Sequence, residues 1–282
     1  MSEREAAPAA ASERASHNLL VRILASLVLA PLTIGAAYAG GWLWTTLVTL
    51  AAIGLYLEWL MVVGAARAVR ITASGSVALV VSGAYLAAGE IELALAAQLL
   101  GLVVVALLSS EQRGWAAAGF LYAAATQTAS VLVRLDTVAG FAALIFVVLV
   151  VWVTDSGGYF AGRGIGGPKL WPRVSPKKTW AGATGGFVAS LALATGFAVN
   201  GLGKIGPVLL LGATLSIASQ LGDLFESAVK RRFGVKDSSH IIPGHGGLLD
   251  RLDGFVAAVV LAAIFGFLRG GADGVGRGLM LW

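Results

Sequence analysis

Cysteine is absent from the 282-residue sequence, which excludes disulfides, thiolate nucleophiles and cysteine-based zinc sites. Histidine is scarce, with three residues and no metal-binding spacing, and this also argues against zinc. Charged residues make up only 12% of the chain, against 57% hydrophobic residues. No polar stretch is long enough to form a second, soluble domain. The composition therefore points away from soluble folds and toward the membrane.

What the sequence has in abundance is apolar segments of about 20 residues, with a mean hydropathy of +0.84. They predict an all-α polytopic membrane protein with about nine transmembrane helices in one integral-membrane domain, residues 19–282. Residues 1–18 are polar and Ala-rich, which predicts a disordered cytoplasmic tail. The nine segments are 19–39, 42–64, 71–88, 92–109, 115–134, 137–154, 180–200, 205–229 and 252–269.

The first apolar segment also imitates a signal peptide, because Ala37-Tyr38-Ala39 resembles a cleavage site. Its apolar run is long, however, and the start of the chain is not a basic region. We therefore expect this segment to be retained as a membrane helix.

Lysine and arginine are distributed unevenly among the predicted loops. With the N-terminus inside, most of the 20 basic residues fall on the cytoplasmic side, as the positive-inside rule requires. The net charge of +5 is thus explained by membrane topology, and no nucleic-acid partner is expected. Two long polar loops, about 155–179 and 230–251, are predicted to face the cytoplasm together and to form the site.

The densest polar stretch is residues 227–253, SAVKRRFGVKDSSHIIPGHGGLLDRLD. Just upstream, Asp223, Ser227 and Lys230 stand at positions i, i+4 and i+7, so the three share one helix face. Glu226 lies beside them. Ionisable groups at a membrane edge are costly to desolvate and by default mark a working site. The alternative is an internally paired Asp–Lys set that only packs helices.

Two more aspartates open the last apolar segment. Asp250 and Asp253 share a helix face at i, i+3, although either one also suits a helix start as a capping residue. Because Asp223 and Asp250 lie at facing ends of consecutive helices, the two carboxylates are expected to meet. Carboxylate and phosphate oxygens favour Mg²⁺ over zinc. The sequence therefore predicts a magnesium site at Asp223 and Asp250.

Several loop residues are candidates for phosphate contact. Cationic side chains hold phosphates and glycines let the backbone approach a ligand closely, although loop cations also serve topology and a lone histidine can be inert. Ser175-Pro176 predicts a helix start, which would place two lysines near the positive end of a helix dipole. The candidates are Lys177, Lys178, Lys236, His245, Gly246, Gly247 and Arg251.

Two further carboxylates lie in or beside apolar segments. Asp155, at the end of the sixth segment, is a candidate for an additional ligand. Glu58, inside the second, is either structural or part of a substrate path. The nearby run Gly162-x-Gly164-x-Gly166-Gly167 follows a membrane helix and no Gly-Lys-Ser/Thr comes after it, so it is neither a dinucleotide fingerprint nor a P-loop.

The stretch from Ser227 to Asp253 resembles the signature of bacterial phosphatidate cytidylyltransferases. The matching positions are Ser227-x-Val229-Lys230-Arg231, Lys236-Asp237-x-Ser239, Ile242-Pro243-x-His245-Gly246-Gly247-Leu248 and Asp250-Arg251-Leu252-Asp253. Gln220-Leu221-Gly222-Asp223 and Ser175-Pro176-Lys177-Lys178-Thr179-Trp180 are similar to other motifs of that family. The resemblance is close over residues 150–255. It departs at Ala181, where the family usually has an acidic residue, so whatever that carboxylate does in relatives is not done here.

The resemblance implies transfer of the CMP moiety of CTP to phosphatidic acid, giving CDP-diacylglycerol and pyrophosphate at a bacterial inner membrane. It also implies Mg²⁺, with or without a monovalent cation such as K⁺, and a homodimer. By the same resemblance Asp223 and Asp250 contact the metal. Ser227, Lys230 and Asp253 are then the neighbouring catalytic residues.

Two alternatives remain open at this point. A CTP-dependent lipid kinase, or another lipid-phosphate transferase, would use similar metal and phosphate chemistry. The kinase would transfer the γ-phosphoryl group. A secondary transporter would use Glu58 and Asp223 as coupling carboxylates. Transporters favour internal repeats and midplane sites. The sequence shows no repeat and gathers its polar residues in one zone, so the transporter is disfavoured.

Overall fold

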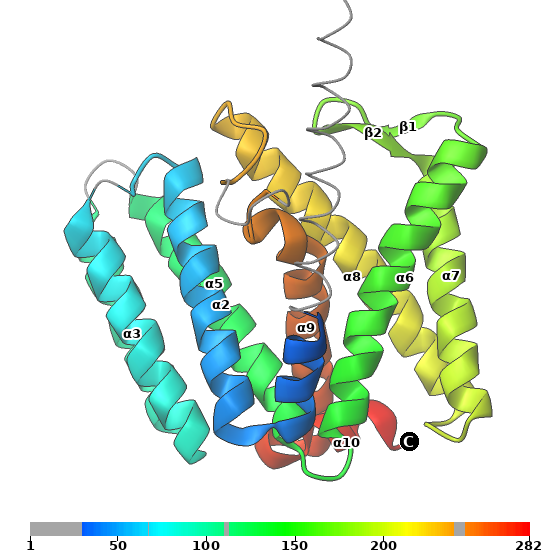
Figure 1. Cartoon of the computed structure of the whole chain (residues 1–282), viewed down its shortest axis with the longest axis horizontal. Helices are drawn as coiled ribbons and strands as arrows, with labels where there is room; N and C mark the ends of the chain where they lie inside the picture. The colour runs from blue at the N-terminus through cyan, green and yellow to red at the C-terminus, as the bar shows by residue number, and fades with distance from the viewer. Residues whose placement is uncertain (1–29, 67, 110–112, 240–245) are drawn as a thin grey trace, which may run out of the picture.

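A computed structural model of the chain describes residues 30–66, 68–109, 113–239 and 246–282. Within these residues, eight helices are long and apolar enough to cross a membrane, and they form one bundle (Figure 1). The expected all-α polytopic membrane protein is confirmed. The helices are α2 (Gly41–Val62), α3 (Val69–Ala88), α4 (Ile91–Leu108), α5 (Arg113–Leu135), α6 (Gly140–Gly164), α7 (Trp180–Val199), α8 (Ile205–Arg232) and α9 (Leu249–Gly270).

Eight of the expected spans correspond to these helices, and most ends lie close to the predicted ones. The first expected span, 19–39, is helical over residues 30–39. Its remainder and the expected tail, 1–18, lie outside the described residues. The count of nine spans and the retention of the first therefore stay predictions.

Helix α6 continues well past residue 154, where the prediction ended it, and reaches Gly164. The extension is stabilised by close packing on α7, since a Cβ at Gly182 would lie only 2.9 Å from the carbonyl oxygen of Gly158. Such backbone approach between membrane helices requires small residues and offsets the low helix propensity of glycine. Asp155 consequently lies inside a helix and not at the start of a loop.

Two short strands form an antiparallel hairpin between α6 and α7: β1 (Lys169–Trp171) and β2 (Ser175–Thr179). The sequence predicted a helix starting at Ser175-Pro176 here, and that prediction is wrong. Both strands of a two-stranded sheet are edge strands, and an edge strand tolerates a proline because not every N–H has to pair. The lysines that follow therefore extend from a strand that leads into the helix.

The start of α7 is instead set by Thr179. Its hydroxyl accepts the N–H of Gly182 at 3.1 Å, which satisfies one of the unpaired donors of the first turn. The N–H of Trp180 donates to the carbonyl of Pro168 at 3.1 Å and ties the hairpin to the helix. The hairpin and the described ends of the connection between α8 and α9, residues 233–239 and 246–248, lie at the same end of the bundle (Figure 1).

The opposite end is closed by η1 (Ala272–Gly274) and α10 (Val275–Met280), which lie below α5 and α6 (Figure 1). In the core, α2 and α5 bury most of their length, whereas α4 and α7 leave most of theirs exposed. Exposed apolar side chains on such helices suit contact with lipid. The bundle thus has a largely apolar interior and a periphery of exposed apolar side chains, and its two ends differ chemically.

Candidate active site

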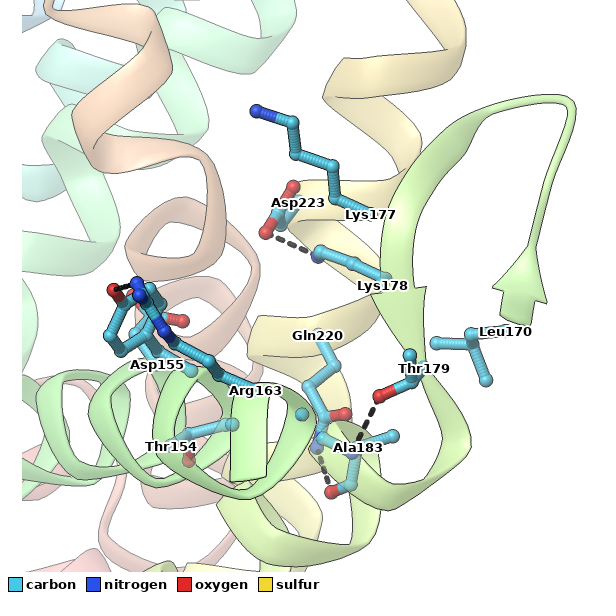
Figure 2. A pocket seen from close by; sticks show the side chains of 14 residues that line it. Thr154, Asp155, Arg163, Leu170, Lys177, Lys178, Thr179, Ala183, Gln220 and Asp223 are labelled. Carbon is cyan, nitrogen blue, oxygen red and sulfur yellow. Dashed lines mark hydrogen bonds and ion pairs between the residues drawn. The ribbon is translucent and has the colours of Figure 1, made fainter. Parts of the chain in front are cut away.

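The hairpin end of the bundle contains a cavity of about 590 Å³ between α6, α7, α8 and the β-hairpin (Figure 2). Its walls carry cations from the hairpin and α6, and carboxylates from α6 and α8. The charged and amide side chains that line it are Asp155, Arg163, Lys177, Lys178, Gln220 and Asp223. The cavity therefore offers both signs of charge to a ligand.

Asp223 lies on the wall that α8 contributes. It forms an ion pair with Lys178 of β2 (Figure 2), and it accepts a long hydrogen bond of 3.4 Å from the hydroxyl of Ser227. The side chains of Asp223 and Lys178 are each 28% exposed, so both are within reach of a ligand. The structure thus adds Lys178 of the hairpin to Asp223 and Ser227, which the sequence had already placed on one helix face.

A close crossing of α8 and α9 adds a second aspartate. A Cβ at Gly222 would lie 2.6 Å from the carbonyl oxygen of Asp253, so only glycine lets the helices approach this closely. The negative charges of Asp155, Asp223 and Asp253 interact with one another. Lys178 interacts with all three. We call Asp155, Asp223 and Asp253, from three different helices, the carboxylate cluster.

Lys230 belongs to a different group. Its Nζ lies 2.6 Å from Asp250 Oδ1 and 2.7 Å from Glu226 Oε2. The side chain of Lys230 is 12% exposed and that of Glu226 1%, so one lysine is shared by two carboxylates largely away from solvent. Asp223 and Asp250, which were expected to meet, therefore have different cationic partners, Lys178 and Lys230.

The turn before α9 is shaped around Asp250. Its carboxylate accepts the backbone N–H of Ser238 and that of Gly247, both at 3.1 Å to Oδ2. Gly246 has a φ of 82°, in the left-handed region that favours glycine. The predicted glycines thus have a local structural reason. His245 lies outside the described residues.

The other predicted phosphate contacts are spread over this end of the molecule. Lys177 lines the cavity beside Lys178. Lys236 and Arg251 are exposed, in the connection after α8 and in the first turn of α9. Neither is among the residues that line the cavity, so their role in phosphate binding stays a prediction. Ala181, where the sequence departs from the family pattern, lies in the first turn of α7.

Sequence reasoning missed part of the cavity wall. Arg163 donates a 2.8 Å hydrogen bond to the Tyr159 hydroxyl, and both residues line the cavity. Gln220 also lines it, one turn before Asp223 on α8. The i, i+4 spacing of Tyr159 and Arg163 was a usable signal, but only for a helix that continues past residue 154.

The donor groups at this end could hold a magnesium ion that is also bound by substrate and water, but not a metal ion bound by protein side chains alone. Among the described residues, no three His, Asp or Glu side chains are grouped so that they could hold a metal ion. Mg²⁺ in phosphate chemistry needs fewer, because it is typically bound by one or two carboxylates together with substrate phosphates and water. Asp223, half-exposed toward the cavity, meets that requirement. Asp250 already accepts hydrogen bonds from Lys230, Ser238 and Gly247.

Comparison with known proteins places this geometry in a family. The profile of the Cytidylyltransferase family matches residues 20–268. A phosphatidate cytidylyltransferase of Brucella suis biovar 1 (strain 1330) is 41% identical over 256 residues, covering 88% of this chain and 93% of the relative. The phosphatidate cytidylyltransferase of Bacillus subtilis (strain 168) is 50% identical over 119 residues, 42% of this chain and 44% of the relative.

A third relative, the phosphatidate cytidylyltransferase of Haemophilus influenzae (strain ATCC 51907 / DSM 11121 / KW20 / Rd), is 47% identical over 139 residues, 47% of this chain and 48% of the relative. The long match to the Brucella protein and the family profile both extend through the early helices, beyond the polar signature. The chain therefore belongs to the Cytidylyltransferase family.

Proposed function

We propose that the protein transfers the CMP moiety of CTP to phosphatidic acid, giving CDP-diacylglycerol and pyrophosphate for phospholipid biosynthesis. The observation that carries this proposal is the cavity at one end of a membrane bundle, which is lined by Lys178 together with Asp155 and Asp223 of the carboxylate cluster. Its volume of about 590 Å³ suits a small-molecule ligand. Relatives named phosphatidate cytidylyltransferase support the same reaction.

The reaction asks for charge neutralisation more than for acid–base chemistry. A phosphate oxygen of the lipid attacks the α-phosphorus of CTP, and the bond between that phosphorus and the oxygen bridging to the β-phosphate breaks. Pyrophosphate leaves with the electron pair. The attacking phosphate is already an anion at pH 7, so no strong general base is needed. Two polyanions must approach each other, and the protein's task is to hold them in line.

We assign the phosphate-holding role first to Lys177 and Lys178, which line the cavity from β2. Lys230, in the neighbouring group, would hold lipid phosphate as it approaches from the bilayer. The acyl chains stay among the apolar helices while the headgroup enters the polar end. Lys236 and Arg251 are proposed to contact phosphate at the exposed rim.

We further propose that Mg²⁺ is the cofactor. Asp223 would hold the ion, with Asp250, which is paired with Lys230 in this structure, as its second protein ligand. When bound, the ion would neutralise phosphate oxygens and charge on the leaving group. The mutual repulsion within the carboxylate cluster supports a cation at this place, and a monovalent ion such as K⁺ would act in the same direction.

The proposed reaction fixes a side of the membrane. CTP is a cytoplasmic nucleotide, so we propose that the hairpin end faces the cytoplasm of a bacterial cell at its inner membrane. The distribution of lysine and arginine supports this orientation. Assembly as a homodimer is proposed from the family resemblance alone, and light scattering of the detergent-purified protein would test it.

The reaction is tested by following two labels. Detergent-purified protein receives phosphatidic acid, Mg²⁺ and CTP that is ³²P-labelled at either the α- or the γ-phosphate, with EDTA as the metal control. We expect label in the lipid only from α-labelled CTP, with pyrophosphate formed in equal amount and no product in EDTA. Label transferred from γ-labelled CTP would identify a lipid kinase and overturn the proposal.

The orientation is tested with single cysteines, which the chain allows because it has none of its own. Lys236→Cys lies at the hairpin end, and Leu202→Cys lies in the exposed connection between α7 and α8 at the other end. In intact cells, a membrane-impermeant maleimide is expected to label only the Leu202→Cys protein. Labelling of the Lys236→Cys protein alone would reverse the proposed orientation.

A further inference from the structure

Glu58 is a carboxylate in the last turns of the membrane helix α2, and its side chain is fully buried. An ionised carboxylate at such a position is costly unless every lone pair finds a donor. Glu58 is not among the residues that line the cavity. The hydrogen-bond donors around the Glu58 carboxylate therefore indicate the role of this residue.

Among the residues that the structure describes, four donors surround the Glu58 carboxylate. Its Oε1 accepts the Ser239 hydroxyl at 2.7 Å and the Leu248 N–H at 2.8 Å. Its Oε2 accepts the Ser238 hydroxyl at 2.8 Å and the Leu249 N–H at 2.7 Å. A carboxylate has about four lone-pair sites, so all are used, and bonds to an ionised acceptor are among the stronger ones in proteins.

The donors come from both ends of one segment. Residues 238–239 follow α8, and residues 248–249 begin α9; together we call them the loop base. The N–H groups of Leu248 and Leu249 belong to the helix start, where donors have no partner within the helix. Glu58 thus caps α9 from a different helix, although Leu248 and Leu249 are 190 and 191 residues away in sequence. Through the two serines, it also joins the start of α9 to the chain that follows α8.

The contact is tight as well as complete. A Cβ at Gly247 would lie 1.8 Å from the Ser238 hydroxyl and 2.6 Å from Glu58 Oε2. Any larger residue at Gly247 would therefore push the loop base off the Glu58 carboxylate. This gives the second glycine of the predicted motif a specific structural reason.

The loop base also holds Asp250. The N–H of Ser238, whose hydroxyl binds Glu58, donates to Asp250 at 3.1 Å. Asp250 in turn lies 2.6 Å from Lys230 Nζ. A continuous set of hydrogen bonds therefore runs from Glu58 through Ser238 to the pair that we place in phosphate and metal binding.

From these contacts we propose that Glu58 is a positioning residue, which clamps the loop base and thereby sets the place of Asp250 and Lys230. The activity part of this inference rests on the proposed function, whereas the clamp itself does not. Glu58 is fully buried, accepts hydrogen bonds from four donors among the described residues and does not line the cavity. Its effect on turnover is therefore indirect and passes through Asp250.

The main test is Glu58→Gln, which keeps the shape but replaces one acceptor oxygen with a donor NH₂ facing two other donors. In the full-length protein we expect kcat to fall about 10²-fold, the size of effect that a small misplacement of reacting groups produces. The KM for CTP should stay near the wild-type value, because the cavity wall around Lys178 is untouched. Melting temperature is measured in parallel, so that kcat is expressed per folded enzyme.

Hydrogen exchange provides a readout that does not depend on activity. The amides of Leu248 and Leu249 donate to Glu58, so they should exchange faster in the Glu58→Gln protein, while amides in the middle of α9 stay protected. The matched control is Glu92→Gln, the same change at an exposed position in the first turn of α4. It should leave both exchange and kinetics unchanged.

A second variant covers the case in which the Glu58→Gln protein does not fold. Ser239→Ala removes one donor of four and should give a smaller loss of kcat, with faster exchange of Leu248. In the double variant the two losses should not add, since they break one network. Wild-type exchange at Leu248 and Leu249, or wild-type kcat, in the folded variants would overturn the clamp. If the wild type makes no CDP-diacylglycerol but exchange changes as expected, the proposed function fails and the clamp stands.

Discussion

The two ends of the bundle both hold buried charge, but they treat it differently. At the end opposite the cavity, buried Asp136 lies between α5 and α6 and accepts hydrogen bonds from Val138 N at 2.8 Å and Arg277 N at 2.7 Å. The Arg277 guanidinium adds an ion pair of 3.0 Å. One carboxylate is matched there by one cation and by backbone donors.

At the cavity end, the carboxylate cluster brings three interacting carboxyl groups together around Lys178. Like charges that converge in a partly buried place raise the free energy of the protein. A balanced charge, as at Asp136, needs no ligand to explain it. At the cavity end, Arg163, Lys177 and Lys178 also line the wall, so charges of both signs face one space that a phosphate ligand and its cation can enter.

We expect charges at the cavity end to serve activity and those at the Asp136 end to serve stability. The variant with the largest expected effect is Asp223→Asn. We expect turnover to fall about 10²–10³-fold, the usual cost of removing one group that stabilises charge in a transition state. The melting temperature should stay equal to that of the wild type or rise, because one of three repelling charges is gone and a half-exposed ion pair contributes little. Lipid product and thermal unfolding are measured on the same preparation. An active Asp223→Asn protein would remove the metal assignment.

A smaller effect is expected from Lys178→Ala. Losing one charge-assisted contact to phosphate should raise the KM for CTP about tenfold, which corresponds to about 1.4 kcal/mol. The matched control is Lys169→Ala, in the other strand of the same hairpin and not among the cavity-lining residues. Steady-state kinetics at varied CTP measure both. Equal KM changes in the two variants would mean that the hairpin acts only through its overall charge.

Much of the fold was predictable from the sequence, because a membrane helix is defined locally by its own hydropathy. The spans from α2 to α9 were found in this way, and only the end of α6 was far from its prediction. That end is set by glycine contacts with α7, and Gly158 meets Gly182 through packing that no local pattern reports. The hairpin was missed for a related reason, since Ser175-Pro176 has the local pattern of a helix start.

The site was predictable in its residues but not in its pairings. Spacing placed Asp223 and Lys230 on one helix face, yet each is bound by a partner from another element, Lys178 for the first and Asp250 for the second. The sequence did not decide whether Glu58 is structural or part of a substrate path, because its hydrogen-bond donors lie 180 or more positions away. Asp136 and Arg277, 141 positions apart, gave no local signal at all.

At the balanced end, Asp136→Asn should have the opposite effect to Asp223→Asn. Breaking a buried charged hydrogen-bond network costs about 1–3 kcal/mol, so the melting temperature should fall. Activity per folded enzyme should remain within about twofold of the wild type, because the proposed site is the cavity at the other end. Thermal unfolding and lipid product measure the two effects. If the Asp136→Asn protein lost activity without losing stability, the Asp136 end would be shown to influence the chemistry at the cavity end.

The smallest expected effect is a dependence on pH at this same end. Burial alone would raise the pKa of Asp136, but the N–H groups of Arg277, Val138 and Ala139 and the Arg277 guanidinium outweigh it, and the pKa is lowered. A lowered pKa contributes stability above the carboxyl's unfolded value of about 3.9, and this contribution is lost as pH falls through the folded value.

The difference in melting temperature between the wild type and the Asp136→Asn protein should therefore be constant between about pH 7 and 5 and shrink toward pH 3, the range set by the unfolded carboxyl. Unfolding followed by tryptophan fluorescence at several pH values measures it. At the lowest pH, a protonated Asp136 has already lost the stabilising contribution of its charge. A difference in melting temperature that persists undiminished there would therefore mean that the asparagine destabilises the protein by its shape and not by its lack of charge.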